Sequence, residues 1–197
     1  MLPIIFLVVF SGRYFWGHKL EESFWWSTYL IELIFIISVL FFYSKDIKKF
    51  LKWNHSFLKK AVIFLIFGGL SRYFIYLGGW SIPWDLNDPL TIFILLIIAP
   101  LLEESLYRGA IWILLSKMIN GPKKILGLTS GLFSLSHLYP IWFVDQRFAP
   151  MIYTQTIYTF VLGLGCGQAL LKHKSFGLSV LRHFMFNVGF YFFSRML

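Results

Sequence analysis

The chain has 197 residues, of which 58% are hydrophobic and 21% aromatic, while only 14% are charged. Soluble domains contain about 45 to 50% apolar residues, so this composition excludes an ordinary soluble domain and indicates a polytopic membrane protein. The formal net charge of +9 does not indicate a nucleic-acid partner, because the lysines cluster in short segments between apolar stretches, as they do in cytoplasmic loops.

Six stretches of the sequence match the length of a membrane-spanning helix, which needs about 20 predominantly apolar residues. In chain order they cover residues 25–43, 61–80, 90–116, 125–143, 151–171 and 176–193. Residues 2–16 form a weaker seventh stretch, interrupted by Arg13, which is either a short span or an interfacial segment. The expected fold is an all-α transmembrane helical bundle with six to seven spans.

The distribution of charge between these stretches predicts how they are oriented. Residues 44–60 contain six lysines and one acidic residue, Asp46, so this loop is predicted to be cytoplasmic. Alternation of the spans then places five further lysines on the same side: Lys117, Lys123, Lys124, Lys172 and Lys174. Residues 81–89 contain Asp85 and Asp88 and no basic residue, and are predicted to lie outside. The predicted localisation is the cell membrane, with multiple passes.

Three charged residues outside the main polar cluster also fall within predicted spans. By helical rise, Glu32 and Arg72 lie about 10 and 12 Å below the outer ends of their spans, so we expect a buried ion pair between them. Arg182 is close enough to the cytoplasmic face for its side chain to extend there.

Small residues predict where helices approach closely. Cys166 is the single cysteine, which excludes an internal disulfide, and it lies in an apolar stretch with Gly163 and Gly167. The spacing of Gly163 and Gly167 is typical of close helix packing, and Gly127 and Gly131 repeat it on the preceding span.

The sequence EESLYRG at residues 103–109 places two carboxylates and a guanidinium inside an apolar stretch. A charged side chain near the bilayer centre costs about 2.5 to 3.5 kcal/mol on insertion scales, so these charges require pairing or a function. Glu104 and Arg108 are four residues apart and are predicted to pair. Glu103 lies about 100° around the helix from Glu104 and is therefore left available.

Polar residues on three predicted helices fall at one depth. Helical rise places Glu103, His137, His183 and Asn187 at a common level, in the middle to cytoplasmic half of the bilayer. Each of them would otherwise pay its own desolvation cost, so we interpret them as one water-containing site. In such a site a glutamate is a candidate general base.

These residues also form an ordered set of motifs. Glu103, Glu104 and Arg108 fit E-E-x-x-x-R, residues 133–137 (FSLSH) fit F-x-x-x-H, and residues 183–187 (HFMFN) fit H-x-x-x-N. In this the chain resembles the CPBP intramembrane proteases, which include the type II CAAX prenyl endopeptidases and the bacteriocin-processing or immunity proteins once called Abi. The resemblance covers residues 90–194, so we divide the chain into an N-terminal transmembrane region, residues 1–88, and a catalytic helical core, residues 89–197.

The resemblance implies a glutamate-type endopeptidase that forms no covalent intermediate. In this interpretation Glu103 and His137 activate a water molecule, and His183 and Asn187 stabilise the oxyanion. Glu104 and Arg108 support them. The implied substrate is a protein or peptide at the membrane, processed near its cytoplasmic side, with no cofactor; the residues predict neither the substrate nor the oligomeric state.

Other chemistries were weighed against this one. Zinc is a possible cofactor because two histidines and a glutamate form a known ligand set, but H-E-x-x-H is absent and Arg108 disfavours a cation. Cys166 lacks neighbours that would activate a thiol. The serines at 130, 134 and 136 lack a G-x-S-x-G motif. A non-catalytic immunity or regulatory protein, using the same cluster to bind a partner, is the main alternative to an enzyme.

Overall fold

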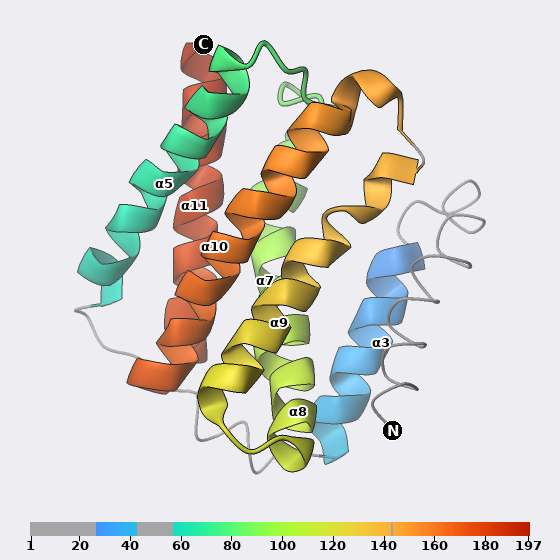
Figure 1. The fold of residues 1–197 in the computed structure, drawn as a ribbon, viewed down its shortest axis with the longest axis vertical. Helices are drawn as coiled ribbons and strands as arrows, with labels where there is room; N and C mark the ends of the chain where they lie inside the picture. The colour runs from blue at the N-terminus through green and yellow to red at the C-terminus, as the bar shows by residue number, and fades with distance from the viewer. Residues whose placement is uncertain (1–26, 43–56, 143) are drawn as a thin grey trace.

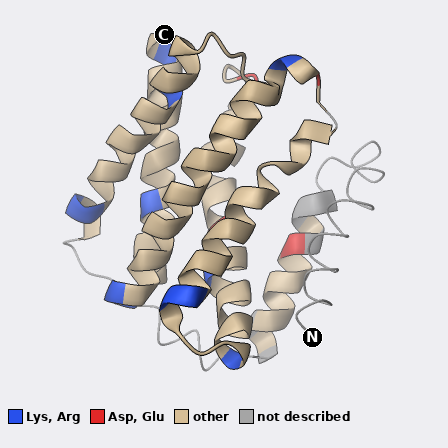
Figure 2. Cartoon of the chain, viewed as in Figure 1, with Lys and Arg blue, Asp and Glu red and all other residues tan. Residues whose placement is uncertain are grey.

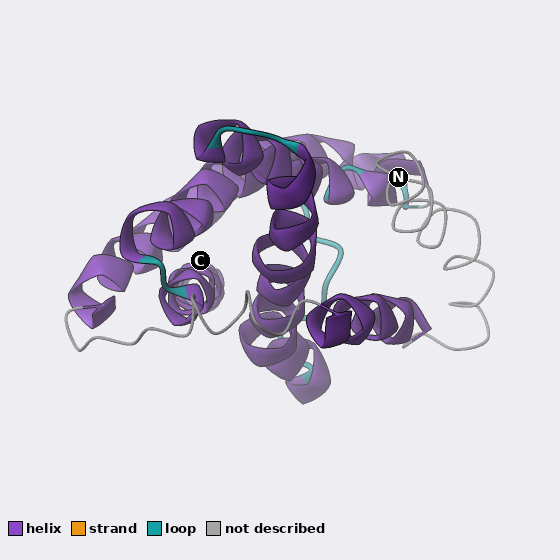
Figure 3. Ribbon diagram, turned by 90° about the horizontal axis from the view of Figure 1, so that it is seen from below, coloured by secondary structure: helices purple, strands orange, loops and turns teal. Residues whose placement is uncertain are grey.

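The computed structural model describes residues 27–42, 57–142 and 144–197, and in these ranges the chain forms helices and no strands (Figures 1 and 3). Helices occupy all six of the strongly predicted stretches. They are α3 (Ser27–Phe42), α5 (Phe57–Leu77), a continuous helical stretch Pro89–Met118, α9 (Pro122–Ser136), α10 (Ala149–His173) and α11 (Phe176–Met196). The 3₁₀ turns η5 (Tyr139–Trp142) and η6 (Gln146–Phe148) connect α9 to α10.

Two of the described helices, Phe57–Leu77 and Pro89–Met118, are long and apolar enough to cross a membrane. The helices α3 and α9 contain 16 and 15 residues, fewer than the roughly 20 that a span needs. The all-helical class is therefore confirmed for the described residues, whereas the count of six to seven spans stays a prediction. The possible seventh span at residues 2–16 and most of the basic loop at 44–60 lie outside the described residues.

The stretch Pro89–Met118 begins where Asp88 caps it. The Asp88 carboxylate accepts hydrogen bonds from the hydroxyl and backbone N–H of Thr91 and from the N–H of Leu90. These bonds satisfy N–H groups that have no partner in the first turn, and Pro89 has none to satisfy. The Thr91 hydrogen bonds lower the pKa of Asp88 below its ordinary value. The cap is therefore expected to hold at neutral pH and to weaken only in strong acid.

The helices pack in a bundle around the Pro89–Met118 stretch. Helix α5 runs along α11, α10 packs against both α9 and α11, and α3 packs on the opposite side of the bundle from α5 (Figure 1). The tightest approach is between α5 and α11, where Gly68 and Gly189 lie directly against the backbone of the facing helix. No side chain fits at either position.

Helix α9 ends earlier than the sequence predicts. We expected a helix to residue 143, but α9 ends at Ser136 and His137 is its C-terminal capping residue. Pro140 explains the difference, because its ring would clash with the carbonyl of Ser136, four residues earlier, and it has no N–H to donate. His137 therefore lies at a helix end instead of inside a span.

The expected ion pair between Glu32 and Arg72 is wrong. Arg72 donates from Nε to the Ser194 hydroxyl at 2.9 Å, whereas Glu32 is buried on α3, across the bundle. Arg182 likewise does not extend to a membrane surface. It donates to the Gly165 carbonyl, and its guanidinium carbon lies 5.1 Å from the centroid of the Phe64 ring.

The predicted small-residue pairs have different outcomes. Gly163 and Gly167 lie against Ser130 and Leu126 of α9, as the close-packing prediction requires. Gly127 and Gly131 have no neighbouring atom within 4 Å of where a Cβ would stand, so they mediate no packing within the described part of the chain.

These differences give a matched test of the α5–α11 contact. We expect Gly68→Ala to lower the free energy of unfolding by about 1 to 3 kcal/mol or more, because a Cβ there overlaps the Phe186 carbonyl and the two backbones must separate. Gly131→Ala, where the space is open, serves as the control and should not destabilise the protein. Thermal stability of the purified variants in detergent measures both, and equal stability of the two would contradict the packing described here.

Candidate active site

A cavity of about 550 Å³ lies between the Pro89–Met118 stretch, α10 and α11. Its walls are largely apolar and aromatic, with Trp84, Tyr158 and Phe186 among them. All four residues of the predicted catalytic set line it: Glu103, His137, His183 and Asn187. Cavities of this size and composition are typical of substrate sites.

Glu103 lies between the two histidines. Its Oε2 is 3.7 Å from His183 Nε2 and its Oε1 is 4.0 Å from His137 Nε2. The side chains of Glu103 and His137 are each 17% exposed, whereas that of His183 is 4% exposed. The carboxylate is therefore shielded but still reachable from the cavity.

The opposite edge of each imidazole is held by an oxygen acceptor. His137 Nδ1 lies 2.9 Å from the Phe133 carbonyl, and His183 Nδ1 lies 3.0 Å from Glu104 Oε1. A carbonyl or carboxylate oxygen can only accept, so both Nδ1 atoms are assigned as donors. This assignment leaves both Nε2 atoms directed at Glu103.

Glu104 is fully buried and has three partners. Its carboxylate lies 3.3 Å from Arg108 Nε, accepts from the Ser179 hydroxyl at 2.6 Å and accepts from His183 Nδ1. The predicted pairing of Glu104 with Arg108 is thereby confirmed. Arg108 also donates to the Gly163 carbonyl at 2.8 Å, so this network connects the Pro89–Met118 stretch to α10 and α11.

Phe133, the aromatic residue four positions before His137, packs among the side chains of the site. Its ring is fully buried, with its centroid 4.7 Å from the Arg108 guanidinium carbon, 4.7 Å from the His137 ring and 5.6 Å from the His183 ring. It therefore separates the buried cation from the imidazoles and fixes the planes of both rings.

Asn187 is held by an irregular turn in the opposite helix. The Pro89–Met118 stretch contains two π-helical segments, η3 (Ile94–Ile98) and η4 (Ser105–Ile111), and within η3 the Ala99 N–H donates to the Ile94 carbonyl. The Leu95 carbonyl would then pair with residue 100, but Pro100 has no N–H. Asn187 Nδ2 donates to Leu95 instead, at 2.7 Å.

The sequence interpretation missed two features of the site. Ser179 binds Glu104, and it precedes His183 and Asn187 at intervals of four residues on α11, a spacing that could have identified it. Tyr158 and Gln155 line the cavity from α10, and no spacing or motif marked them. Cys166 is fully buried and does not line the cavity.

The described residues contain no group of three or more His, Cys, Asp or Glu side chains arranged to hold a metal ion. The arrangement that comes closest to such a group is the Glu103 carboxylate with the Nε2 atoms of His137 and His183. The adjacent Glu104 carboxylate is already paired with Arg108.

Comparison with known families matches the motifs to a protease family. The family model described as Type II CAAX prenyl endopeptidase Rce1-like matches residues 85–189, more than half of the chain. The chain belongs to this family. Rce1-like proteins are membrane-embedded proteases of the CAAX type, so a peptide substrate at the membrane follows for this chain in general terms. No curated protein and no solved structure matches it.

The two adjacent glutamates predict opposite effects on stability. Glu104→Gln leaves Arg108 buried without its carboxylate, so we expect the free energy of unfolding to fall by about 3 to 5 kcal/mol. Glu103→Gln changes a partly exposed carboxylate and should alter stability much less. Thermal unfolding of both purified variants compares them, and a Glu104→Gln variant as stable as the unmodified chain would contradict a structural role for this network.

Proposed function

We propose that this Rce1-like chain is an intramembrane endopeptidase that hydrolyses a peptide bond in a membrane-associated protein or peptide, with water as the nucleophile. The observation that supports this most strongly is the position of Glu103, whose carboxylate faces the Nε2 atoms of both histidines in a largely apolar cavity.

Glu103 and His137 are proposed to activate the water. With Nδ1 protonated, neutral His137 presents an Nε2 lone pair beside the Glu103 carboxylate, so one water molecule can donate an O–H to each. The oxygen lone pair of this water then attacks the substrate carbonyl carbon, while one proton of the water passes to Glu103. Glu103 returns that proton to the amide nitrogen as the C–N bond breaks, which gives a carboxylic acid and an amine.

His183 and Asn187 are proposed to stabilise the oxyanion. Because His183 Nδ1 already donates to Glu104, a hydrogen bond from Nε2 to the oxyanion requires a proton on both ring nitrogens. In that form the positive charges of His183 and Arg108 balance the two carboxylates. Asn187 uses one of its two N–H donors on Leu95, and the second remains for the substrate.

Nucleophiles from the chain itself are less well supported. Cys166 is buried away from the cavity. The Ser136 hydroxyl lies in the cavity, but it donates to the Phe133 carbonyl, and the nearby His137 Nδ1 carries a proton that it donates to the same oxygen. His137 cannot accept a proton from Ser136 in that arrangement.

Replacement of the proposed base should remove activity without unfolding the protein. We expect Glu103→Gln and His137→Ala each to slow hydrolysis by at least about 10² to 10⁴-fold, the usual contribution of acid–base catalysis. Asp145→Asn, which changes an exposed carboxylate in the α9–α10 connection, is the control. Mass spectrometry of membrane peptides from cells that produce each variant measures the effect. Fragments made by the enzyme should be lost in the two site variants and kept in the control.

The same comparison tests the non-catalytic alternative. If both site variants keep the full biological activity of the chain, the polar cluster serves partner binding, as in an immunity or regulatory protein, and the enzymatic proposal is wrong.

The proposed chemistry uses no metal. Hydrolysis by the purified chain should therefore persist after treatment with a strong zinc chelator, because no step depends on a Lewis acid. Loss of hydrolysis that added zinc restores would establish the metalloprotease alternative.

A further inference from the structure

The two ends of the bundle differ in charge. Seven lysines of the described residues lie at one end, with no acidic residue among them: Lys59, Lys60, Lys117, Lys123, Lys124, Lys172 and Lys174. The other end carries three aspartates, Asp85, Asp88 and Asp145, together with three arginines, Arg72, Arg147 and Arg195 (Figure 2). In membrane proteins the loops rich in lysine and arginine remain in the cytoplasm. The lysine-rich end is therefore assigned to the cytoplasmic side.

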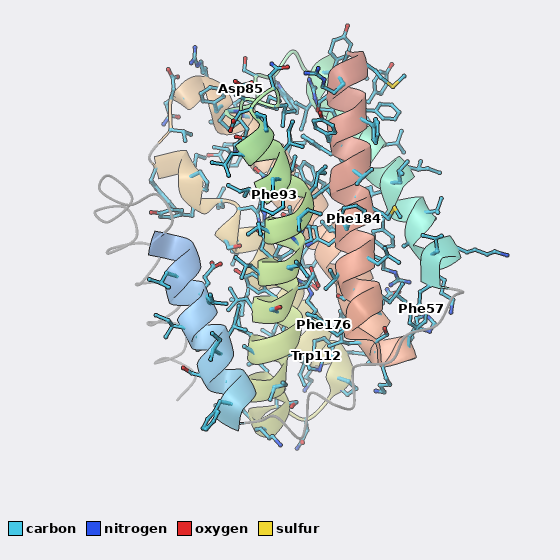
Figure 4. All side chains as sticks on the ribbon, turned by 180° about the vertical axis from the view of Figure 1, so that it is seen from behind. Phe57, Asp85, Phe93, Trp112, Phe176 and Phe184 are labelled. Carbon is cyan, nitrogen blue, oxygen red and sulfur yellow. The ribbon has the colours of Figure 1, made fainter. Side chains whose placement is uncertain are left out.

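The cavity extends to the opposite end. It is lined by the first half of the Pro89–Met118 stretch, by the first half of α10 with Leu162, and by the second half of α11 with His183 just before it. No lining residue follows Glu103 within the Pro89–Met118 stretch. These helices alternate in direction, so all three halves lie at the aspartate-bearing end. Figure 4 shows Asp85 at this end, with Phe57 and Phe176 at the other.

The connections at the aspartate-bearing end form the outer part of the cavity. Trp84, which is 36% exposed, and Leu86 come from the α5–Pro89 connection, while Tyr139 and Val144 come from the α9–α10 connection. Among the described residues that line the cavity there is no lysine and no arginine. A peptide segment with apolar or aromatic side chains fits these walls.

We propose that the cavity opens to the extracytoplasmic side of the membrane, and that its substrate is an apolar segment of an exported or outward-facing polypeptide. The claim that the cavity holds a substrate rests on the proposed endopeptidase function, whereas the direction in which the cavity opens does not. It reverses our expectation that cleavage occurs near the cytoplasmic side. A prenylated cytoplasmic protein would meet the lysine-rich end, away from this cavity.

Cysteine accessibility tests the direction of opening without requiring catalysis. The background is the full chain with Cys166→Ala, which removes the single native thiol. Three exposed or half-buried positions are probed separately: Asp85→Cys in the outer connection, Gln155→Cys in the cavity wall and Lys123→Cys at the lysine-rich end. Intact cells and permeabilised cells are treated with a membrane-impermeant maleimide.

Asp85→Cys and Gln155→Cys should react to the same extent in intact and permeabilised cells, whereas Lys123→Cys should react only after permeabilisation. The opposite pattern would overturn the proposed orientation. Reaction at Asp85→Cys in intact cells without reaction at Gln155→Cys would overturn the proposal that the cavity is open to this side. Adding Glu103→Gln should leave the labelling unchanged, so a failure of the proposed hydrolysis is distinguished from a failure of this inference.

Discussion

The buried Glu104 carboxylate is the interaction on which the rest of the site depends. It holds Arg108 on its own helix, Ser179 and His183 on α11, and through Arg108 the Gly163 carbonyl on α10. Because every oxygen of this carboxylate is occupied, His183 has one favourable orientation. That orientation directs its Nε2 toward Glu103. The buried carboxylate of Glu104 thus determines the surroundings of Glu103, its neighbour in the sequence.

Irregular helix geometry contributes as much as the side chains. Pro100 removes a donor from the centre of a long helix, and the π-helical segment before it leaves the Leu95 carbonyl for Asn187. Pro140 ends α9 at Ser136 and places His137 at the start of a connection, beside the cavity. Two prolines inside apolar stretches, which would weaken an ordinary helix, here position two residues of the candidate site.

Sequence alone predicted that the polar residues meet at one level, but not how the helices that carry them pack. Helical rise along each stretch gave a common level for Glu103, His137, His183 and Asn187, and the structure brings these four to one cavity. The same reasoning paired Glu32 with Arg72, which lie on helices across the bundle from each other. Helical rise gives only the position of a residue along its helix axis. Its lateral position depends on which helices pack together, and for α5 and α11 the packing is decided by Gly68 and Gly189, which no motif marked.

The central claim is that Glu103 activates water and forms no bond to the substrate. Single-turnover hydrolysis by the purified chain in water enriched in ¹⁸O, analysed by mass spectrometry of both product and protein, tests this directly. The account predicts one ¹⁸O atom in the new carboxyl group and no increase in the mass of the chain at any time during the turnover. A transient acyl adduct on Glu103, Ser136 or Cys166 would contradict it.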